Sequence, residues 1–195
     1  NKASDDASGL AIADKLRTQV TSINQGVSNG NSAIALLQIA DKSMAEQSKI
    51  LDTVKAKLIQ ANTDTTSADG RTAIAKDVSK LLEQLNNIAK QTNYNGTNLL
   101  QAAATSTATK TALSFQIGEN PSDMIETAAI QANTLGYGLD TLSAAAGTGA
   151  SAAAGASVFT RAQATAGQTA VDTAITKLNG YRGDIGSTQN QVESA

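Results

Sequence analysis

Apolar residues recur with a helical period over much of the chain. From Leu16 onward they follow one another at steps of three, four or seven for about forty positions, which predicts a long first helix at about residues 5–62. Such a pattern is longer than that of a typical globular helix, and it indicates a rod-like helix packed along partner helices. The members of this stripe are Leu16, Val20, Ile23, Val27, Ile34, Leu37, Met44, Leu51 and Leu58.

Two further segments show helical spacing. Apolar residues at alternating steps of four and three predict a second helix at about residues 68–91, and the turn signal Asn95-Gly96 follows it. Apolar residues at steps of seven predict a return helix at about residues 158–195. The two sets are Ile74, Val78, Leu81, Leu85 and Ile88 in the second helix, and Val171, Leu178, Ile185 and Val192 in the third.

The segment between these helices, about residues 98–157, reads as a β and loop insert. Its stretch TALSFQIG alternates polar and apolar residues and predicts a short strand at 111–117. The following MIETAAIQA either pairs back as a second strand or forms a loose segment. Residues 141–157 are rich in Ala, Gly and Ser, and we interpret them as a surface loop or a frayed helix start, because this composition buries little apolar area.

Composition narrows the fold class. Hydrophobic residues make up 41% of the chain and are mostly Ala, whereas aromatic residues make up 3% and only one Pro is present, which suits close-packed helices. We therefore predict a mainly α fold, an elongated antiparallel helical bundle of three long helices with a small β-hairpin element near its outer end. Residues 1–195 are expected to form a single core domain.

Charge and residue types exclude several functions. The net charge is −2 without a basic cluster, so an electrostatic grip on nucleic acid or on an anionic membrane is not expected. There is no His and no Cys, which removes the commonest general base and the thiolate metal ligands. Asp5-Asp6 suits a helix start better than a cation site, and the Asp/Thr-rich run 63–69 lacks the closing Glu of a calcium loop. We predict no metal, no cofactor and no enzymatic activity.

Three functions fit such a bundle: a subunit of an extracellular filament, a helical signalling rod, and a secreted needle or translocator protein. A signalling rod would be expected to carry charged edges beside its stripes for partner choice. The stripes here are poor in charge and rich in Asn, Gln, Ser and Thr, which favours polar packing between subunits. From the residues alone, all three alternatives stay open.

Four motifs, in order along the chain, resemble bacterial flagellins. NKASDDASGLAIADKLRTQV is similar to the start of the first densely packed flagellin domain, and QTNYNGTNLL to the turn after its second helix. TALSFQIG is similar to the hairpin strand that follows, and LNGYRGDIGSTQNQVESA to the C-terminal return helix. The matching residues are Asp5, Asp6 and Gly9 in the first motif, Asn95 and Gly96 in the second, and Arg182, Gln189, Asn190 and Glu193 in the last.

The resemblance implies a structural role. A flagellin polymerises with other flagellin subunits into the extracellular flagellar filament, which serves motility, and it leaves the cell through the flagellar export apparatus with the help of a chaperone. Flagellins also carry N- and C-terminal helices that line the inner tube of the filament, and this sequence resembles a core fragment lacking both. Neither nucleic acid nor membrane is implied as a partner.

The resemblance also implies weak recognition by the host receptor for flagellin, Toll-like receptor 5. Many flagellins present an Arg and a Leu to this receptor near the end of the first helix. In LDTVKAKL these positions hold Thr53 and Lys57, while the acidic position on the second helix is kept as Asp77. A guanidinium fork and an apolar anchor are thereby lost. A similar departure is familiar from flagellins of the Campylobacter and Helicobacter group.

Flagellins of that group often carry O-linked acidic sugars on outward-facing Ser and Thr residues. The resemblance places residues 141–160 on the outer face of the filament. The candidate positions for O-glycosylation are Ser143, Thr148, Ser151 and Ser157.

Overall fold

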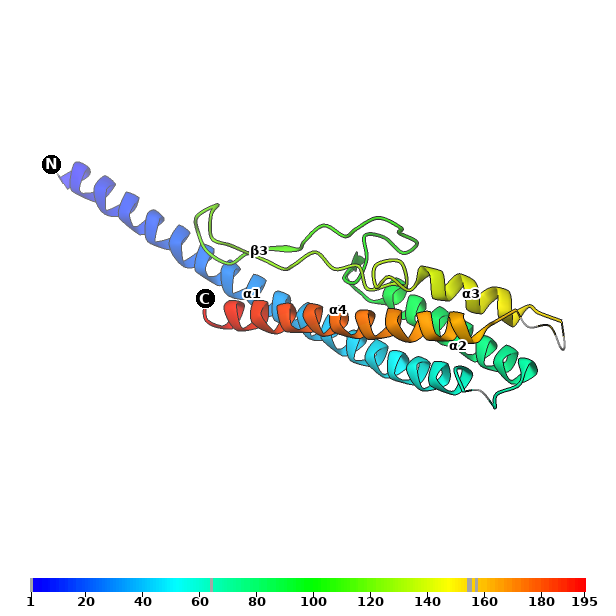
Figure 1. Ribbon diagram of the computed structural model, residues 1–195. Coiled ribbons are helices and arrows are strands. Elements are labelled where there is room, and N and C mark those ends of the chain that lie inside the picture. Colours follow the sequence, from blue (N-terminus) through cyan, green and yellow to red (C-terminus); the bar gives the residue numbers. More distant parts are fainter. Residues whose placement is uncertain (1, 64, 154–155, 157) are drawn as a thin grey trace.

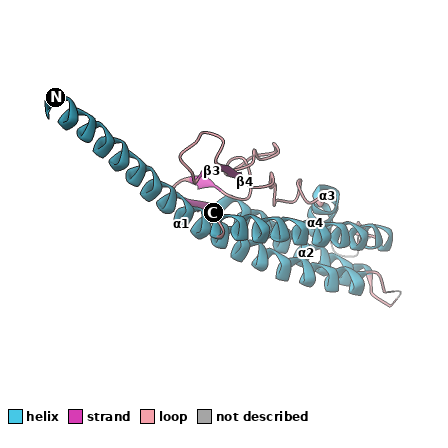
Figure 2. Ribbon diagram, turned by 90° about the vertical axis from the view of Figure 1, so that its left-hand side faces the viewer, coloured by secondary structure: helices cyan, strands magenta, loops and turns pink. Residues whose placement is uncertain are grey.

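The computed structural model describes residues 2–63, 65–153, 156 and 158–195, with side chains from Gly9 onward. Four helices are present in the described residues: α1 (Lys2–Ala61), α2 (Ala68–Gln91), α3 (Asp140–Ala150) and α4 (Arg161–Glu193). α1 runs the length of an elongated bundle, and α4 lies antiparallel along it (Figure 1). Turned by 90°, Figure 2 shows the N-terminal part of α1 projecting beyond the other helices. The predicted mainly α, elongated, antiparallel bundle is confirmed.

Local capping explains where the helices begin and end. α1 ends at Ala61, before a run of turn formers, and the Ser67 hydroxyl then accepts the Gly70 N–H at 3.0 Å to start α2. α4 starts with a capping box, in which the Thr160 hydroxyl accepts the Gln163 N–H at 3.2 Å and the Gln163 side chain accepts the Thr160 N–H at 3.0 Å. The turn formers thus end α1, and Ser67 and Thr160 start α2 and α4 at the same end of the bundle.

The seam between α1 and α4 forms the centre of the core. On each helix, residues spaced by seven face the partner, as in a coiled coil. Seven of these side chains are 0–2% exposed: Leu37, Met44, Leu51 and Leu58 on α1, and Val171, Leu178 and Ile185 on α4. The heptad prediction for the return helix is therefore confirmed.

α2 lies against α1 and buries a face slightly rotated from the predicted one. Ile74, Val78 and Leu85 are buried as expected, whereas Leu81 is only half-buried and its neighbour Leu82 is 1% exposed. The rotation places Leu82 in the main core. The reason is that α3 covers a second side of α2, so that α2 packs between two neighbours.

α3 corrects the interpretation of residues 141–157 as a loop or frayed helix start, and it adds a fourth helix to the three predicted. Its residues Leu142 and Ala146 are buried against the core, so this Ala-rich segment gains apolar contacts that its composition alone does not promise. Gly149 makes the approach possible: a Cβ there would lie 2.8 Å from the Phe159 Cβ and 2.9 Å from the Ala75 Cβ. Small residues thus bring α3 close to α2.

Two short antiparallel hairpins lie between α2 and α3. β1 (Asn93–Tyr94) pairs with β2 (Thr97–Asn98) around the predicted turn, where Asn95 and Gly96 have φ of 50° and 82°. These left-handed values explain the Asn-Gly sequence. β3 (Ser114–Gln116) pairs with β4 (Met124–Glu126), so the predicted strand at 111–117 forms over three residues and the second-strand alternative for MIETAAIQA is correct.

The position of the β3–β4 hairpin corrects the expectation that it lies near the outer end of the bundle. The hairpin lies instead near the end where the chain terminates, beside α1 (Figure 2). The Asn29 side chain of α1 donates to the Gln116 carbonyl at 2.7 Å, and Ile125 shares a small cluster with Ala33 and Val192. Contacts between residues far apart in sequence therefore decide where the hairpin docks.

A buried polar cluster ties four parts of the chain together. Gln47 of α1 is fully buried and donates to the Leu85 carbonyl at 3.1 Å and to the Ala132 carbonyl at 2.7 Å. Its side-chain oxygen accepts the Tyr137 hydroxyl at 2.8 Å, and the Tyr137 ring lies 6.1 Å from that of Tyr181 on α4. Both polar atoms of the buried Gln47 side chain are hydrogen-bonded, so the cluster specifies a single arrangement of α1, α2, α4 and the 130–137 segment.

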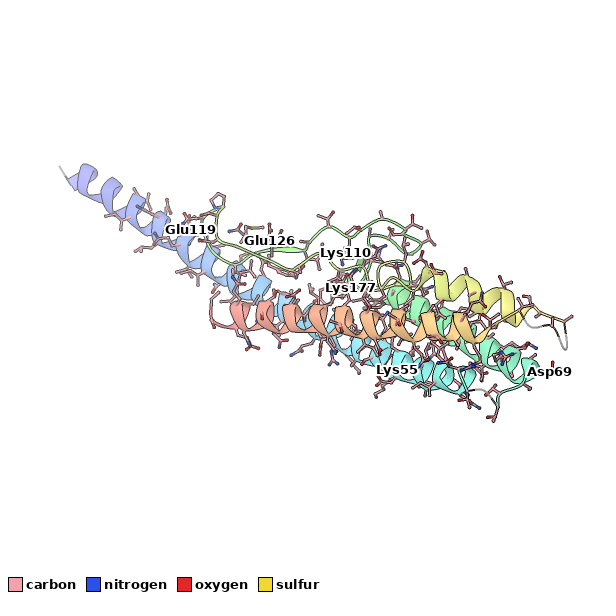
Figure 3. The ribbon with its side chains drawn as sticks, viewed as in Figure 1. Lys55, Asp69, Lys110, Glu119, Glu126 and Lys177 are labelled. Atoms are coloured by element: carbon pink, nitrogen blue, oxygen red, sulfur yellow. The ribbon has the colours of Figure 1, made fainter. Side chains whose placement is uncertain are left out.

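Lys110 is a buried amine in the insert (Figure 3). Its Nζ donates to the Asn98 carbonyl, and Leu36, Leu113 and Ile185 line the small cavity around it. Burial lowers the pKa of Lys110 from its ordinary 10.5 to about 8, because the charged form loses its hydration. The ammonium form therefore opposes folding at neutral pH.

We expect Leu85→Ala to lower the free energy of unfolding by about 2–5 kcal/mol, because Leu85 is fully buried and truncation leaves a cavity. Ile185→Ala, on the α4 side of the seam, should cost a similar amount. Ile59→Ala is the matched control, since Ile59 lies on α1 but is 49% exposed, and it should cost less than about 1 kcal/mol. Urea titrations giving equal losses for the buried and exposed positions would contradict the packing described here.

A second prediction concerns the pH dependence of stability. The pKa of Lys110 is about 8 in the folded protein and 10.5 in the unfolded chain, so the unfolded chain binds more protons between these two pH values. As the pH rises through this range, the cost of burying the charged amine disappears and the free energy of unfolding rises. Lys110→Met should remove this rise. Denaturant titrations of the two proteins between pH 7 and pH 10 measure the difference in their free energies of unfolding. The range ends at pH 10 because burial raises the pKa of Tyr137 above its ordinary 10.0, which lowers stability at higher pH. Parallel curves for the two proteins would contradict the assignment.

Candidate functional site

The N-terminal half of α1 exposes part of the apolar stripe that the rest of the helix buries. We call this set, Leu16, Val20, Ile23 and Val27, the α1 stripe; its members are 56%, 57%, 63% and 59% exposed. From Leu37 onward the same stripe is buried against α4. The change occurs near Gly30, where a Cβ would lie 3.7 Å from Val192 near the C-terminal end of α4. A row of exposed aliphatic side chains along one helix face marks an interaction surface.

A groove adjoins the α1 stripe at this point. It has a volume of about 420 Å³ and lies between α1, the end of the β3–β4 hairpin and the end of α4. Ile23 and Val27 of the stripe line it together with Ile117 and Val192, while Glu119 and Glu193 add carboxylates. Figure 3 shows Glu119 at the hairpin end beside α1. The groove therefore presents an apolar surface with acidic groups, of a size that suits the side of another helix.

Gly26 allows the hairpin to form one wall of this groove. A Cβ at position 26 would lie 2.6 Å from the Ile117 carbonyl oxygen, which is closer than Cβ atoms approach other heavy atoms. Asn29, one helical turn further on, holds the neighbouring Gln116 carbonyl. A Gly inside a helix lowers helix stability relative to Ala, and the role of Gly26 in this close approach is visible only in the tertiary structure.

The residues predicted to face the host receptor lie near one another on α1 and α2. The Lys57 Nζ lies 3.2 Å from Asp77 Oδ2 in an ion pair between the two helices. Thr53 is exposed, and its hydroxyl donates to the Lys49 carbonyl of the same helix at 3.1 Å. The sequence did not predict that Lys57 pairs with Asp77, the acidic residue that matches the flagellin pattern.

The other motif residues take structural places. Arg182 forms a two-bond ion pair with Asp41 of α1, Nε to Oδ1 at 2.9 Å and Nη2 to Oδ2 at 3.4 Å, and the hydrogen bond to Asp41 raises the pKa of Arg182. Gln189 donates to Glu193 at 3.4 Å, and Asn190 is exposed. Asp5 and Asp6 lie in α1, but their side chains fall outside the described part; Gly9 is exposed with open space around it.

The candidate glycosylation residues lie on and after α3. Thr148 and Ser151 are exposed, and Ser143 is half-buried with its N–H bonded to the Leu139 carbonyl. Ser157 lies outside the described residues. Two of the four candidates therefore present a hydroxyl-bearing side chain on the surface, on a helix end rather than on the expected loop.

Within the described residues, no group of three or more acidic side chains is arranged to hold a metal ion. No helix there is long and apolar enough to cross a membrane. The α1 stripe and its groove are instead suited to side-by-side packing. This is the geometry of a helical protein that associates along its length.

Comparisons with known proteins agree with this class. The profile of the bacterial flagellin N-terminal helical region matches residues 1–105. Flagellin A of Helicobacter mustelae is 43% identical over 131 residues, which cover 64% of this chain and 26% of that protein. The flagellar filament 30.7 kDa core protein of Treponema maltophilum is 30% identical over 198 residues, covering 100% of this chain and 67% of that protein. The crystal structure of Bacillus cereus flagellin superposes with a TM-score of 0.67 at 26% identity, covering 84% of each chain.

The chain belongs to the bacterial flagellin family, with Helicobacter flagellins among its relatives. This family consists of structural proteins rather than enzymes, in agreement with the prediction of no catalytic activity. The chain spans about a quarter of the length of the Helicobacter flagellin that it matches.

Proposed function

We propose that this chain is part of a structural subunit of the extracellular bacterial flagellar filament, which polymerises side by side with further copies and serves motility. The observation that carries the proposal is the α1 stripe, four aliphatic side chains on one helix face that are each more than half exposed. A helix packed along this row in a polymer would bury it.

The polar surface of the bundle supports the same function. α4 carries Thr165, Thr169, Thr173 and Thr176 on exposed positions, and each hydroxyl donates to the carbonyl four residues earlier. Their methyl groups and the absence of charge at these positions make a surface that loses little hydration when another subunit covers it. Export through the flagellar apparatus with a chaperone is part of the proposed function and comes from the family resemblance alone.

We expect Val20→Glu combined with Ile23→Glu to abolish polymerisation of the full-length protein, because two carboxylates would be buried without partners in the packed stripe. Asn24→Glu is the matched control, since it adds a carboxylate at an already exposed polar position directly after Ile23. Electron microscopy of purified subunits after induced assembly reads the result, and circular dichroism verifies that all variants are folded. Normal filaments from the double variant would show that the α1 stripe is not an assembly surface.

We also propose that this flagellin is poorly recognised by the host receptor for flagellin, Toll-like receptor 5. Three features of the described surface support this: Thr53 supplies no guanidinium, Lys57 supplies no apolar anchor, and Lys57 pairs with the Asp77 carboxylate. The ion pair is half-exposed and therefore weak, so a binding partner could separate it at small cost. The missing anchors are then the larger obstacle, because a few residues usually carry most of the affinity of an interface.

Thr53→Arg together with Lys57→Leu should restore binding of the receptor ectodomain. Each anchor typically contributes about 2 kcal/mol or more, so the pair should raise the affinity on the order of a thousandfold if the two effects add. They lie one helical turn apart on α1, so coupling between them reduces this figure. Surface plasmon resonance with the unmutated protein and the double variant measures the change.

The control carries the same two replacements at exposed positions elsewhere, Thr173→Arg and Lys42→Leu, and should leave binding unchanged. Tight binding by the unmutated protein would refute poor recognition. If the double variant binds no better than the control, the obstacle lies elsewhere on the surface.

We further propose O-linked sugars on the exposed hydroxyls of the α3 region, with Thr148 and Ser151 as the sites that the described surface favours. Ser143 should be less modified because it is half-buried. Ser157 remains a candidate on the basis of the sequence alone. Peptide mass spectrometry of native filaments tests this order. Unmodified peptides covering residues 141–160 in every preparation would count against glycosylation here.

A further inference from the structure

The chain contains three Asn-Gly dipeptides, at 29–30, 95–96 and 179–180, and the structure places them in different surroundings. An Asn followed by Gly can lose its side-chain amide without any enzyme. The backbone nitrogen of the Gly loses its proton and bonds to the Asn Cγ, the Cγ–Nδ2 bond breaks, and the amide nitrogen takes up one proton and leaves as ammonia. Water then opens the resulting five-membered imide to give Asp, or isoaspartate in which the backbone runs through the side chain.

Backbone conformation controls the first step, since the Gly nitrogen must reach the Asn Cγ. Glycine helps because it lacks the Cβ that would hinder this approach. A helix opposes the step, because each peptide N–H is bonded to the carbonyl four residues earlier and the backbone on both sides is held in the helical conformation. Exposed turns have neither restraint.

Asn29 is the most restrained of the three. It lies inside α1, its Nδ2 donates to the Gln116 carbonyl at 2.7 Å, and its Oδ1 accepts from Gln25 at 2.8 Å. Gly30 is buried beneath the end of α4. Both the nucleophile and the electrophilic carbon are therefore held in place.

The Asn179-Gly180 pair distinguishes the effect of exposure to water from the effect of backbone conformation. Both are exposed, and no atom lies within 4 Å of where a Gly180 Cβ would be. They nevertheless lie well inside α4, a helix of 33 residues, so the Gly180 nitrogen is held in the helical hydrogen-bond pattern. This pair is as open to water as an exposed turn but lacks the freedom to react.

Asn95 and Gly96 have both exposure and freedom. They form the tip of the β1–β2 hairpin, are both exposed, and the Gly96 N–H donates no hydrogen bond within the described residues. The strands that hold the turn are two residues long, with the pairs Asn93–Asn98 and Tyr94–Thr97, and one further bond runs from the Leu99 N–H to the Thr92 carbonyl at 3.2 Å. A hairpin this short opens at small cost, so conformations that bring the Gly96 nitrogen to the Asn95 Cγ are readily reached.

We infer that Asn95 is a site of spontaneous deamidation in the folded protein, with water as the only co-reactant, and that Asn29 and Asn179 keep their amides. Conversion to Asp adds one negative charge at the hairpin tip. Conversion to isoaspartate also lengthens the backbone inside a two-residue turn, which breaks the pairing of Tyr94 with Thr97. Tyr94 is half-buried against the core, so this product loosens the chain just after α2.

The test follows all three asparagines in one sample. The folded protein is incubated at mildly alkaline pH in water enriched in oxygen-18, and peptide mass spectrometry measures the label gained at each Asn. Asn95 should convert at least about tenfold faster than Asn179, because opening a short hairpin needs much less free energy than opening the middle of a long helix. The same protein in denaturant provides the reference, in which the three dipeptides should convert at similar rates.

Asn95→Gln serves as the matched variant, since it keeps an amide at the turn but lengthens the side chain so that the five-membered ring cannot form. It should lose the label at position 95 and leave Asn29 and Asn179 unchanged. Equal conversion of Asn95 and Asn179 in the folded protein would overturn the inference. So would an intact Asn95 under conditions in which the denatured chain converts at all three positions.

Discussion

The antiparallel seam between α1 and α4 is the contact on which the rest of the structure depends. Both helices place aliphatic residues every seven positions, so that Leu51 and Leu178 belong to one continuous row of buried side chains. α4 covers α1 only from Gly30 onward, and this difference in extent leaves the α1 stripe exposed.

Close approaches and buried polar groups set the remaining elements on this seam. Gly26 and Gly149 remove side-chain volume at the points where the β3–β4 hairpin and α3 lie nearest to their neighbours. Gln47 then supplies directional bonds that helix packing alone lacks, because its buried side chain joins two backbone carbonyls and the Tyr137 hydroxyl. Aliphatic rows hold the helices together, and these residues decide how the irregular insert is placed on them.

The sequence predicted the elements better than their positions. The spacing of hydrophobic residues and the turn-forming residues were sufficient to predict α1, α2, α4 and the Asn95-Gly96 turn, since these elements depend on neighbours within a few residues. α3 was missed because its Ala- and Gly-rich sequence has little intrinsic apolar area, and its burial depends on Phe159 and Ala75 from other segments. The hairpin was expected at the wrong end because alternation identifies a strand but contains no information about which helix it contacts.

The sequence by itself determined the fold class, the long helices and their family, because heptad spacing and short motifs are local properties of the chain. Only the tertiary structure decided which apolar residues are covered, since Val27 and Leu37 look alike in the pattern but differ in whether α4 reaches them. It also decided that Lys57 pairs with Asp77, and that Asn95 is free while Asn179 is restrained. The physical reason is the same in each case: burial, pairing and restraint depend on residues distant in sequence, and no periodicity encodes those distances.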